Sequence, residues 1–453
     1  MVDSDTYYLI IFLDCQLKII MILTENVLEG ASMYLDKIIV KNYKAISDME
    51  VQFTPGVNLL IGDNGVGKSS MLEAIVVAIS GMFKGVAGVS AKGIMQNDIH
   101  FKVKGKGDAS TEILYGRPSE ITTFFNMDDE NFCLKKYRES EDGSSRTKME
   151  DTGIGKKMQE KVNSSDAILP LLCFQSDARV WQKRRGDFGN GLKKKLTDRR
   201  CGYIGCLDYY LDIKGIQEWC LKMEVAAFQK KKQVKEYEVF KWLVSRFMYI
   251  VNELDEVPDI YYSSQFEEMV YQEGNAAMPI TLLSAGYQSL LWMIMNLAYR
   301  WALLNPDITE NIDKAKGIVL IDEIDMHLHP KWQWKIIKAL EKTFPNVQFI
   351  LTTHSPIVIS SCKNEHLILI TDDQEIVYLE NAYGYSVQDV LNFRQGTVEK
   401  PEEIKILADQ FYQAMEEDNY QAAEKILKGM ADILGENHAD VKAAREELEW
   451  NNL

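Results

Sequence analysis

The chain has few cysteines, and none is spaced for a zinc site. It has seven, an odd number, among 453 residues. Cys201 and Cys206 are too far apart for the usual Cys-x-x-Cys ligand pair, and no matching pair follows. Unpaired cysteines in a chain of this size are typical of a reducing compartment. We therefore predict structural cysteines and a cytoplasmic protein.

The sequence also lacks an uninterrupted apolar run long enough to cross a membrane. Two apolar stretches between residues 7 and 23 are broken by Asp14 and Lys18, whereas a spanning helix needs about twenty mostly apolar residues. No basic leader with a small-residue cleavage site accompanies them. We predict that residues 1–32 are an upstream extension, with a membrane anchor as the alternative, and that the domain begins at Met33.

What the sequence does contain is four short motifs, the first of which fits G-x-x-x-x-G-K-[ST]. An apolar run at residues 57–61 precedes it and predicts a buried strand, and residues 68–83 predict an apolar helix. Such glycines let backbone N–H groups surround phosphate oxygens at a helix N-terminus. Lys68 is expected to reach the β- and γ-phosphates of ATP, and the Ser69 hydroxyl to hold Mg²⁺. The predicted nucleotide-binding residues of this loop are Gly62, Asp63, Asn64, Gly65, Val66, Gly67, Lys68, Ser69 and Ser70.

Two further motifs follow apolar runs that suit central parallel strands. Residues 317–321 lead into Asp322 and Glu323, at the strand end where open α/β sheets bind ligands. Asp322 is predicted to hold Mg²⁺ through water, and Glu323 to orient or deprotonate the attacking water. Residues 347–351 end just before His354, which is a candidate sensor of the γ-phosphate, although a lone histidine is more often structural.

In this order, the four motifs resemble those of ABC-type ATPases of the SMC, RecF and OLD branch. The resemblance covers about residues 33–395 and includes Leu-Ser-Ala-Gly-Tyr-Gln at residues 283–288, which corresponds to the family signature. It implies an α/β fold, a two-lobed P-loop ATPase head. Two heads of that family sandwich ATP, so Ser284 and Gly286 would contact the nucleotide held by the other protomer's Lys68.

The signature segment also has a local interpretation. Ser284 is a suitable N-cap for a helix over residues 285–304, and the N-terminal dipole of that helix can face a γ-phosphate. Gln288 completes the predicted binding set. Without the other motifs, an ordinary capped amphipathic helix would explain this segment equally well.

The resemblance implies two more contacts. Lys44 follows an aromatic residue and would approach the nucleotide, with solvent exposure as an equal alternative. A glutamine between the lobes would link Mg²⁺ to the attacking water. Gln175, after the apolar run at residues 168–174, is our choice for it, and Gln96 competes.

Less specific features resemble the Septu-type anti-phage ATPases, the PtuA group. They are Asp-Glu-Ile-Asp-Met-His-Leu-His-Pro at residues 322–330, Leu-Pro-Leu-Leu-Cys-Phe-Gln at residues 169–175 and a short helical tail. This resemblance implies ATP hydrolysis with Mg²⁺, dimers and larger self-assemblies, and a separately encoded HNH-type nuclease partner, PtuB.

A nuclease domain of the OLD type has no counterpart here. Only 97 residues follow Pro356, and among them Asp372 and Asp373 are an isolated pair. No zinc or HNH constellation surrounds His327 and His329. We predict an ATPase that does not itself cut nucleic acid. The alternative is a RecF-like DNA-repair ATPase that binds DNA directly.

The spacing of the motifs limits the size of the insertion between them. Gly62 and Ser284 are 222 residues apart, too few for the long coiled coil of SMC proteins. A compact helical insertion is predicted at about residues 180–275. Basic stretches within residues 183–200 and 230–232 indicate a face for DNA or a partner. Solvated charge is an even alternative, since no aromatic residues interleave.

The C-terminal tail, residues 400–453, is acidic and helical. From residue 402 onwards it carries thirteen acidic and five basic side chains, a formal charge of −8 out of −16 for the whole chain. Apolar residues at helical spacing predict an αα-hairpin over residues 402–435 and a third short helix. We predict that these apolar stripes dock on another protein. Packing on the chain's own ATPase domain is the alternative.

Overall fold

The computed structural model describes most of the chain. It covers residues 33–104, 112–177, 199–306, 316–379, 382–387, 389–390, 402–417, 419–436 and 438–451. The predicted extension at residues 1–32, the basic residues between 183 and 198 and the predicted domain end at residue 395 lie outside the described residues.

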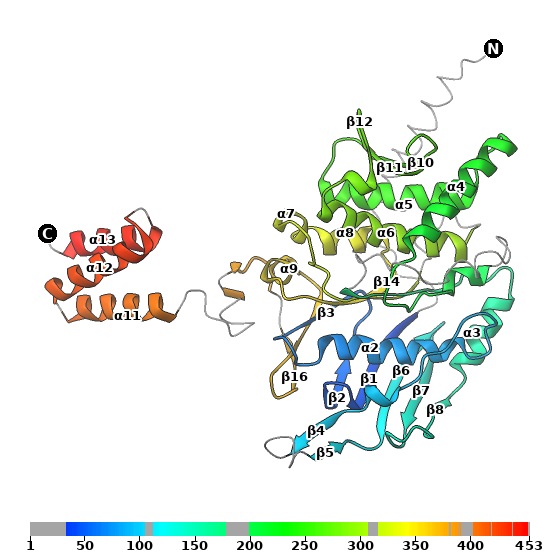
Figure 1. Cartoon of the computed structure of the whole chain (residues 1–453), viewed down its shortest axis with the longest axis horizontal. Helices are drawn as coiled ribbons and strands as arrows, with labels where there is room; N and C mark the ends of the chain where they lie inside the picture. The colour runs from blue at the N-terminus through cyan, green and yellow to red at the C-terminus, as the bar shows by residue number, and fades with distance from the viewer. Residues whose placement is uncertain are drawn as a thin grey trace.

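A six-stranded sheet forms the centre of the molecule (Figure 1). Its order is β16 (Ile376–Leu379), β15 (His366–Ile370), β3 (Val57–Ile61), β14 (Val347–Thr352), β13 (Gly317–Ile321) and β9 (Leu171–Gln175). All pairings are parallel except that of β16 with β15. β3, β9, β13 and β14 are buried along their whole length, as their mostly apolar runs predict. Their carboxyl ends therefore meet at one edge.

Helices cover both faces of this sheet (Figure 1). On one face lies α2 (Lys68–Ile79), which continues as a 3₁₀ turn, η1 (Ser80–Phe83). On the other lie α5 (Lys235–Asn252), α6 (Ala285–Leu304) and α8 (Ile336–Thr343). No helix in the described part of the chain is long and apolar enough to span a membrane.

An antiparallel sheet packs on the outer side of α2 and forms the lower lobe in Figure 1. Its order is β2 (Ile46–Gln52), β1 (Met33–Tyr43), β6 (Ser119–Met127), β7 (Glu130–Arg138) and β8 (Lys148–Asp151). Burial alternates along β1 and β7, as expected for a sheet with one face on the core. α3 (Ile154–Asn163) and a short ribbon of β4 (Phe101–Lys104) and β5 (Glu112–Tyr115) complete this lobe.

The upper lobe is only partly helical. α4 (Ile213–Lys230) and α5 lie in the predicted helical insertion, but the segment after them forms β10 (Asp259–Ser263), β11 (Glu268–Glu273) and β12 (Ala276–Pro279). The prediction of helix up to residue 275 is therefore wrong from residue 259 onwards. A β-branched and aromatic stretch followed by turns, one with Gly274 at φ 53°, favours a meander over a helix.

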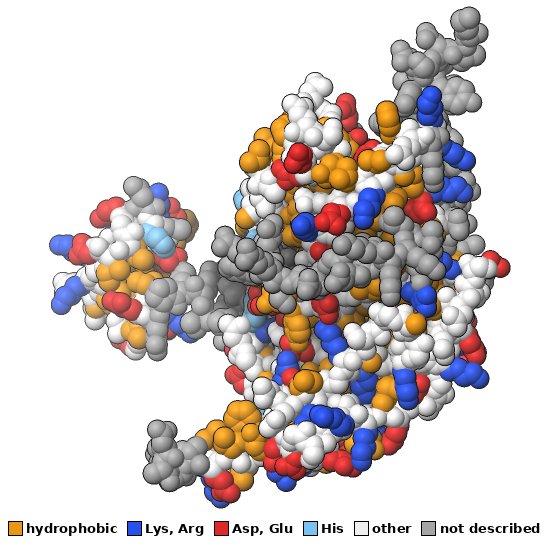
Figure 2. Space-filling view, turned by 45° about the vertical axis from the view of Figure 1, so that its right-hand side comes forward, with side chains coloured by type: hydrophobic (Ala, Val, Ile, Leu, Met, Phe, Trp, Pro, Cys, Tyr) orange, Lys and Arg blue, Asp and Glu red, His pale blue; other side chains and the backbone are white. Residues whose placement is uncertain are grey.

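The tail forms the three predicted helices, α11 (Glu402–Glu416), α12 (Tyr420–Leu434) and α13 (Ala439–Asn451). Asn419 caps α12 by accepting a hydrogen bond from the Ala422 N–H. The apolar stripes pack against one another around Phe411, Leu427 and Val441 in a core separate from that of the ATPase domain. The stripes therefore cover one another rather than the chain's own ATPase domain, and docking of the tail on another protein stays a prediction. In Figure 2 the tail forms a body beside the main mass.

Candidate nucleotide-binding site

Three glycines shape the loop between β3 and α2. Gly62, Gly65 and Gly67 have φ values of 142°, 87° and 115°, which L side chains rarely adopt. A Cβ on Gly62 would also lie 2.3 Å from the Ile370 carbonyl oxygen. The loop therefore keeps its backbone N–H groups free of side-chain cover, the condition for phosphate binding at a helix N-terminus.

Lys68 lies inside this loop. Its Nζ donates to the carbonyl oxygens of Gly62 at 2.8 Å and Asp63 at 2.7 Å. Burial lowers the pKa of Lys68, and the nearby carboxylates of Asp322, Asp63 and Glu323 oppose that effect. The ammonium group thus stands over the loop with carboxylates close by, as the sequence predicts for a group that meets phosphates.

Ser69, Asp322, Thr352 and Glu323 form one hydrogen-bonded chain. The Ser69 hydroxyl donates to Asp322 Oδ1 at 3.2 Å, and the Thr352 hydroxyl donates to the same oxygen at 2.6 Å. The Thr352 oxygen in turn accepts the Glu323 backbone N–H at 2.7 Å. Glu323 has a φ of 46°, an unusual conformation for a residue with a side chain. Thr352 therefore fixes both carboxylate residues at the carboxyl edge of the sheet.

His354 follows β14 at the same edge. Burial lowers the pKa of His354, the Lys68 ammonium lowers it further, and the carboxylates of Asp325, Asp63 and Asp322 act in the opposite direction. The imidazole is therefore close enough to Lys68 to interact with its charge, and the lowered pKa favours the neutral ring. The next residue, Ser355, caps α9 (Pro356–Ser361) and fixes the backbone after the histidine.

Gln175 reaches this edge from β9. It pairs with Ile321 of β13, its carbonyl accepts the Asp322 N–H at 2.8 Å, and its Nε2 donates to the Met293 carbonyl at 3.0 Å. Its Oε1 is buried without a hydrogen-bond partner among the described residues. The competitor Gln96 lies exposed in a 3₁₀ turn, η2 (Gln96–Asp98).

These oxygens fit a magnesium ion. The Ser69 hydroxyl, the Asp322 carboxylate and the orphaned Gln175 Oε1 are hard oxygen donors, which Mg²⁺ prefers. Among the described residues, no group of three or more His, Cys, Asp or Glu side chains converges as a metal site. A cation here would thus depend on the single Asp322 carboxylate, on the hydroxyl and amide oxygens and on phosphate.

Lys44 forms ion pairs that the sequence did not predict. Its Nζ pairs with Glu73 on α2 and lies 3.7 Å from Asp98. The other Glu73 oxygen accepts the Tyr209 hydroxyl at 2.8 Å. The Lys44 side chain is half-buried and joins the antiparallel sheet to the helix that follows the phosphate loop. Its approach to a nucleotide stays a prediction.

The signature residues line a separate pocket. Ser284 caps α6 as predicted, accepting the Tyr287 N–H at 3.5 Å, and Gln288 Nε2 donates to the Leu283 carbonyl at 2.8 Å. A Cβ on Gly286 would lie 2.7 Å from the Trp332 ring and 3.0 Å from the His327 carbonyl oxygen. The pocket has a volume of about 610 Å³, and its lining includes Ser284, Gly286, Tyr287, His327, Lys331 and Trp332.

Known proteins share these features over most of the chain. One family model, described as an AAA domain, matches residues 37–260, and another, described as an AAA ATPase domain, matches residues 204–359. The chain therefore has an α/β P-loop ATPase fold and is similar to ATPases over most of its length. It is 25% identical to the Retron Vc95 probable ATPase of Vibrio cholerae, over 83% of this chain and 81% of that protein.

Two Septu proteins are also similar to the ATPase. It is 27% identical to Septu protein PtuA of Bacillus mycoides, over 86% of this chain but only 49% of that protein. It is 25% identical to Septu protein PtuA of Bacillus thuringiensis, over 83% of this chain and 87% of that protein.

Sequence reasoning missed the role of Thr352. The residue belongs to the Thr-Thr-His-Ser-Pro motif, and its place at the end of a strand beside β13 was the only signal. Its neighbour Thr353 donates to Asp325 and accepts the Ser355 N–H at 2.9 Å. Thr352 and Thr353 thus connect the motif that contains His354 to the acidic segment at residues 322–325. Nothing in the sequence indicated that Glu73 would bind Lys44 and Tyr209.

Thr352→Val is expected to lower kcat for ATP hydrolysis by about 10- to 100-fold, because it removes the group that orients Asp322 and Glu323. ATP affinity should change less, since the phosphate loop stays intact. Steady-state turnover and nucleotide titration measure the two effects. Thr343→Val is the matched control, since that buried hydroxyl donates to the Ala339 carbonyl within α8. Equal kcat values for Thr352→Val and Thr343→Val would show that the Thr352 hydroxyl has no role in ATP hydrolysis.

Proposed function

We propose that this ATPase is the nucleotide-controlled subunit of an anti-phage defence complex. In this proposal it hydrolyses ATP between two copies of its head and regulates a separate HNH-type nuclease of the PtuB kind. The observation that supports hydrolysis is the convergence of Lys68, Ser69, Asp322, Glu323 and His354 at one sheet edge. The similarity to Septu PtuA proteins supports the defence role.

The residues divide the work of phosphoryl transfer. Lys68 and the loop N–H groups bind and orient the phosphates. Ser69, Asp322 and Gln175 would hold Mg²⁺, which when bound neutralises charge on the β- and γ-phosphate oxygens. Glu323 accepts a hydrogen bond from the attacking water and positions it. His354, whose lowered pKa favours the neutral ring, would offer a ring nitrogen to the terminal phosphate.

The signature pocket supports a composite site. Ser284 and Gly286 belong to a pocket built with the 327–332 segment, whereas Lys68 and Ser69 belong to the sheet edge. Ser284 is exposed at the N-terminus of a 20-residue helix, and the helix dipole there favours negative charge. A second copy's nucleotide matches that chemistry, so closure of two heads would complete each site.

The tail is the proposed assembly and nuclease-docking element. Although its helices share a core, Ile406, Tyr412, Ile433 and Trp450 remain exposed, Trp450 to 83%. Exposed large apolar side chains on a small body are typical of protein contacts. The acidic surface disfavours nucleic acid as the partner.

Deleting residues 402–453 is therefore expected to leave ATP binding unchanged, because the tail core is separate from the ATPase core. The deletion should reduce the oligomer mass or the co-purification of an HNH-type nuclease. Light scattering, a thermal melt and pull-down measure these effects. A quadruple variant with Ile406, Tyr412, Ile433 and Trp450 changed to Ser keeps the tail and its charge. It should reduce oligomer mass or nuclease co-purification as the deletion does. A folded deletion variant with unchanged mass and unchanged nuclease binding would contradict the docking role.

A specific surface favours the second candidate, a RecF-like ATPase that binds DNA directly. Lys331, Lys335, Lys338 and Lys342 lie along α7 (Pro330–Gln333) and α8, beside Arg246 of α5. Burial lowers the pKa of Lys342, and the like charges of Lys338 and Arg246 lower it further. Lys335 pairs with Glu253 at 2.5 Å, and the Glu253 carboxylate is also close enough to interact with Lys338 and Lys331. Clustered cations of this kind suit a phosphate backbone.

This surface differs from the basic insertion predicted from the sequence. Of those residues, Arg199 donates instead to the carbonyl oxygens of Leu304 at 2.7 Å and Ser165 at 2.8 Å. Its guanidinium therefore holds the chain together rather than forming an open basic face. Lys231 and Lys232 are exposed at the end of α4.

Changing Lys338 and Lys342 together to Gln is expected to weaken DNA binding uniformly across sequences and to lower the salt slope of log K by about 2. Fluorescence anisotropy over a series of salt concentrations measures both. The matched control is Lys156→Gln with Lys214→Gln, because both lysines are exposed on other faces and each has an i,i+4 carboxylate. An equal loss in both double variants would indicate a general charge effect and would exclude this surface.

A further inference from the structure

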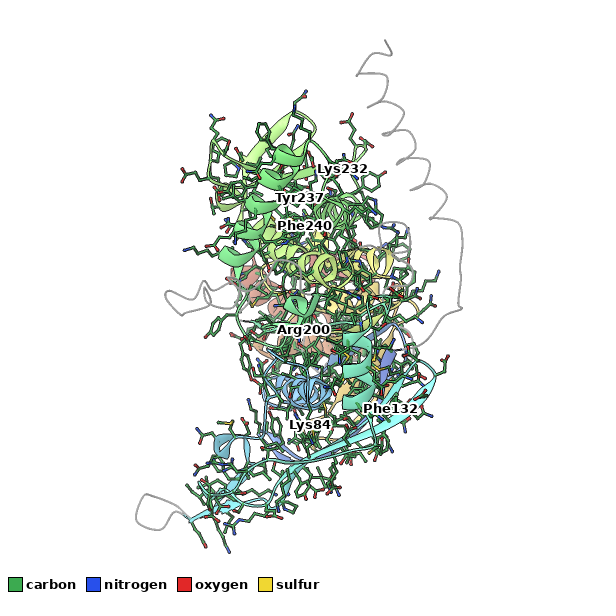
Figure 3. The ribbon with its side chains drawn as sticks, turned by 90° about the vertical axis from the view of Figure 1, so that its right-hand side faces the viewer. Lys84, Phe132, Arg200, Lys232, Tyr237 and Phe240 are labelled. Carbon is green, nitrogen blue, oxygen red and sulfur yellow. The ribbon has the colours of Figure 1, made fainter. Side chains whose placement is uncertain are left out.

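A second cavity lies between the two lobes, apart from the phosphate loop and from the pocket lined by the signature residues. Its volume is about 240 Å³. Residues 83–92, after the phosphate-loop helix, form one side, and residues 201–212 with α4 and α6 form the other. Figure 3 shows Arg200, at the start of the second segment, at the level between Phe132 and Lys84 of the lower lobe and Tyr237 and Phe240 of the upper lobe.

The inner wall of the cavity is aromatic. Phe83 and Tyr203 have ring centroids 5.0 Å apart, and Trp219 and Tyr299 have theirs 5.2 Å apart. Phe83, Tyr203 and Trp219 are almost fully buried. These packed rings give the cavity a rigid apolar wall, which suits an aromatic guest because ring contacts add to the gain from apolar burial.

The cavity wall is held open by a buried arginine. Arg300 of α6 donates to the carbonyl oxygens of Gly202 and Ile204 at 3.0 Å each and of Gly205 at 2.9 Å. The side-chain oxygen of Asn296 also accepts a hydrogen bond, from the Arg300 Nε–H at 3.1 Å. The guanidinium is thus committed to the backbone of the wall. The space is formed by the fold itself and is not a gap that a side-chain rotation would fill.

The cavity lining carries polar groups of both charges. Lys92 lies 3.6 Å from Asp208 and donates to the Leu207 carbonyl. Asp212, the N-cap of α4, accepts the Gly215 N–H at 2.9 Å. The two carboxylates are balanced by Lys92 and Arg300, and both cations are already committed to partners in the wall. The rim therefore offers acceptors to N–H and O–H donors and, among its described residues, no uncommitted cation to a phosphate.

We propose that this cavity binds a small planar aromatic molecule without phosphate, of the nucleobase or nucleoside class. The volume agrees with such a guest. It is far larger than the roughly 10–15 Å³ that one water requires, and it is below the roughly 300–1,000 Å³ of pockets for larger ligands. The aromatic wall takes the ring, and Asp208 and Asp212 accept hydrogen bonds from its polar edge.

Hydrogen bonds connect the cavity wall to the nucleotide-binding site. The Cys206 carbonyl accepts the Phe174 N–H of β9 at 2.8 Å, one residue before Gln175. The Ser176 hydroxyl donates to the Tyr209 carbonyl at 2.6 Å, and the Tyr209 hydroxyl donates to Glu73 of α2 at 2.8 Å. A bound guest would therefore bias the position of Gln175 relative to α2 and change ATP turnover. This coupling rests on the proposed function, whereas binding in the cavity does not.

The test titrates the full chain with adenosine, guanosine, cytidine and uridine and with each 5′-monophosphate. A non-hydrolysable ATP analogue with Mg²⁺ occupies the nucleotide site throughout. Calorimetry and saturation-transfer NMR report binding. Ser90→Trp blocks the cavity from its exposed rim, and Ser144→Trp is the matched control on an exposed turn of the lower lobe.

At least one nucleoside is expected to bind the wild-type chain and Ser144→Trp alike, and to bind Ser90→Trp about tenfold more weakly or not at all. Its 5′-monophosphate should bind less tightly than the nucleoside. The proposal is overturned by no nucleoside binding at millimolar concentration, by equal binding to Ser90→Trp, or by preference for the monophosphate. Unchanged ATP turnover with the nucleoside bound overturns the coupling alone. Absence of turnover in every sample counts against the proposed function and leaves the binding result standing.

Discussion

Glu323→Gln is expected to bind ATP normally and to lower kcat for hydrolysis by about 10²- to 10⁴-fold. The amide keeps the size of the carboxylate but cannot accept a proton from the attacking water. The geometry supports a role in chemistry, because the Glu323 N–H is held by Thr352 beside Asp322 and its carboxylate lies close enough to act on Lys68. Steady-state turnover and nucleotide titration separate the two steps, and closed dimers should accumulate with ATP.

The matched control is Glu160→Gln, an exposed carboxylate on α3 of the lower lobe. It should hydrolyse ATP at the wild-type rate and dissociate after turnover. If Glu323→Gln also kept the wild-type rate, the water would have to be positioned by another group. Loss of ATP binding in Glu323→Gln, with the thermal melt unchanged, would instead make Glu323 a binding residue.

The sheet edge that carries the chemistry could be predicted from the sequence. Mostly apolar runs at residues 57–61, 317–321 and 347–351, interrupted only by Asn58 and Gln348, specify strands buried on both faces, and such strands are typically parallel and central. β3, β13 and β14 bear this out. Because parallel strands end at one edge, motifs that directly follow them must meet, whatever the rest of the chain does.

Contacts between distant segments could not be predicted in the same way. Lys44 pairs with Glu73, which is 29 residues away and precedes no motif. Its partner is set by how β1 and β2 pack on α2, and spacing in the sequence carries no information on that packing. Thr352 acquires its role in a similar way, since only the neighbouring position of β13 brings Asp322 and Glu323 to its hydroxyl.

The segment after α5 and the tail show a different limit. The three strands from residue 259 to 279 are short, and helical periodicity in the preceding residues hid the change of pattern. In the tail the helices themselves were predictable, but an apolar stripe does not specify what covers it. Three stripes in succession can cover one another, and here they do.

Mixing a Lys68→Ala chain with a Ser284→Arg chain is expected to restore part of the ATPase activity that each variant lacks alone. Lys68→Ala removes the charge that meets the phosphates. Ser284→Arg places a bulky side chain at the N-terminus of α6, where the partner's nucleotide would lie. In a heterodimer one site carries both defects, and the other combines an intact phosphate loop with an intact signature. Turnover of the mixture, compared with each variant at equal total concentration, measures the recovery.

The control for this experiment pairs variants whose defects lie in the same half of the site. Lys68→Ala mixed with Glu323→Gln should recover no ATPase activity. Both residues belong to the same sheet edge, so each of the two nucleotide sites in the heterodimer then carries one defect. Ser284 is exposed, so its substitution should cost the fold only the roughly 1 kcal/mol of a lost N-cap, which a thermal melt verifies. Absence of recovery in confirmed Lys68→Ala and Ser284→Arg heterodimers would mean that α6 serves the nucleotide of its own chain or none, because a composite site requires complementation.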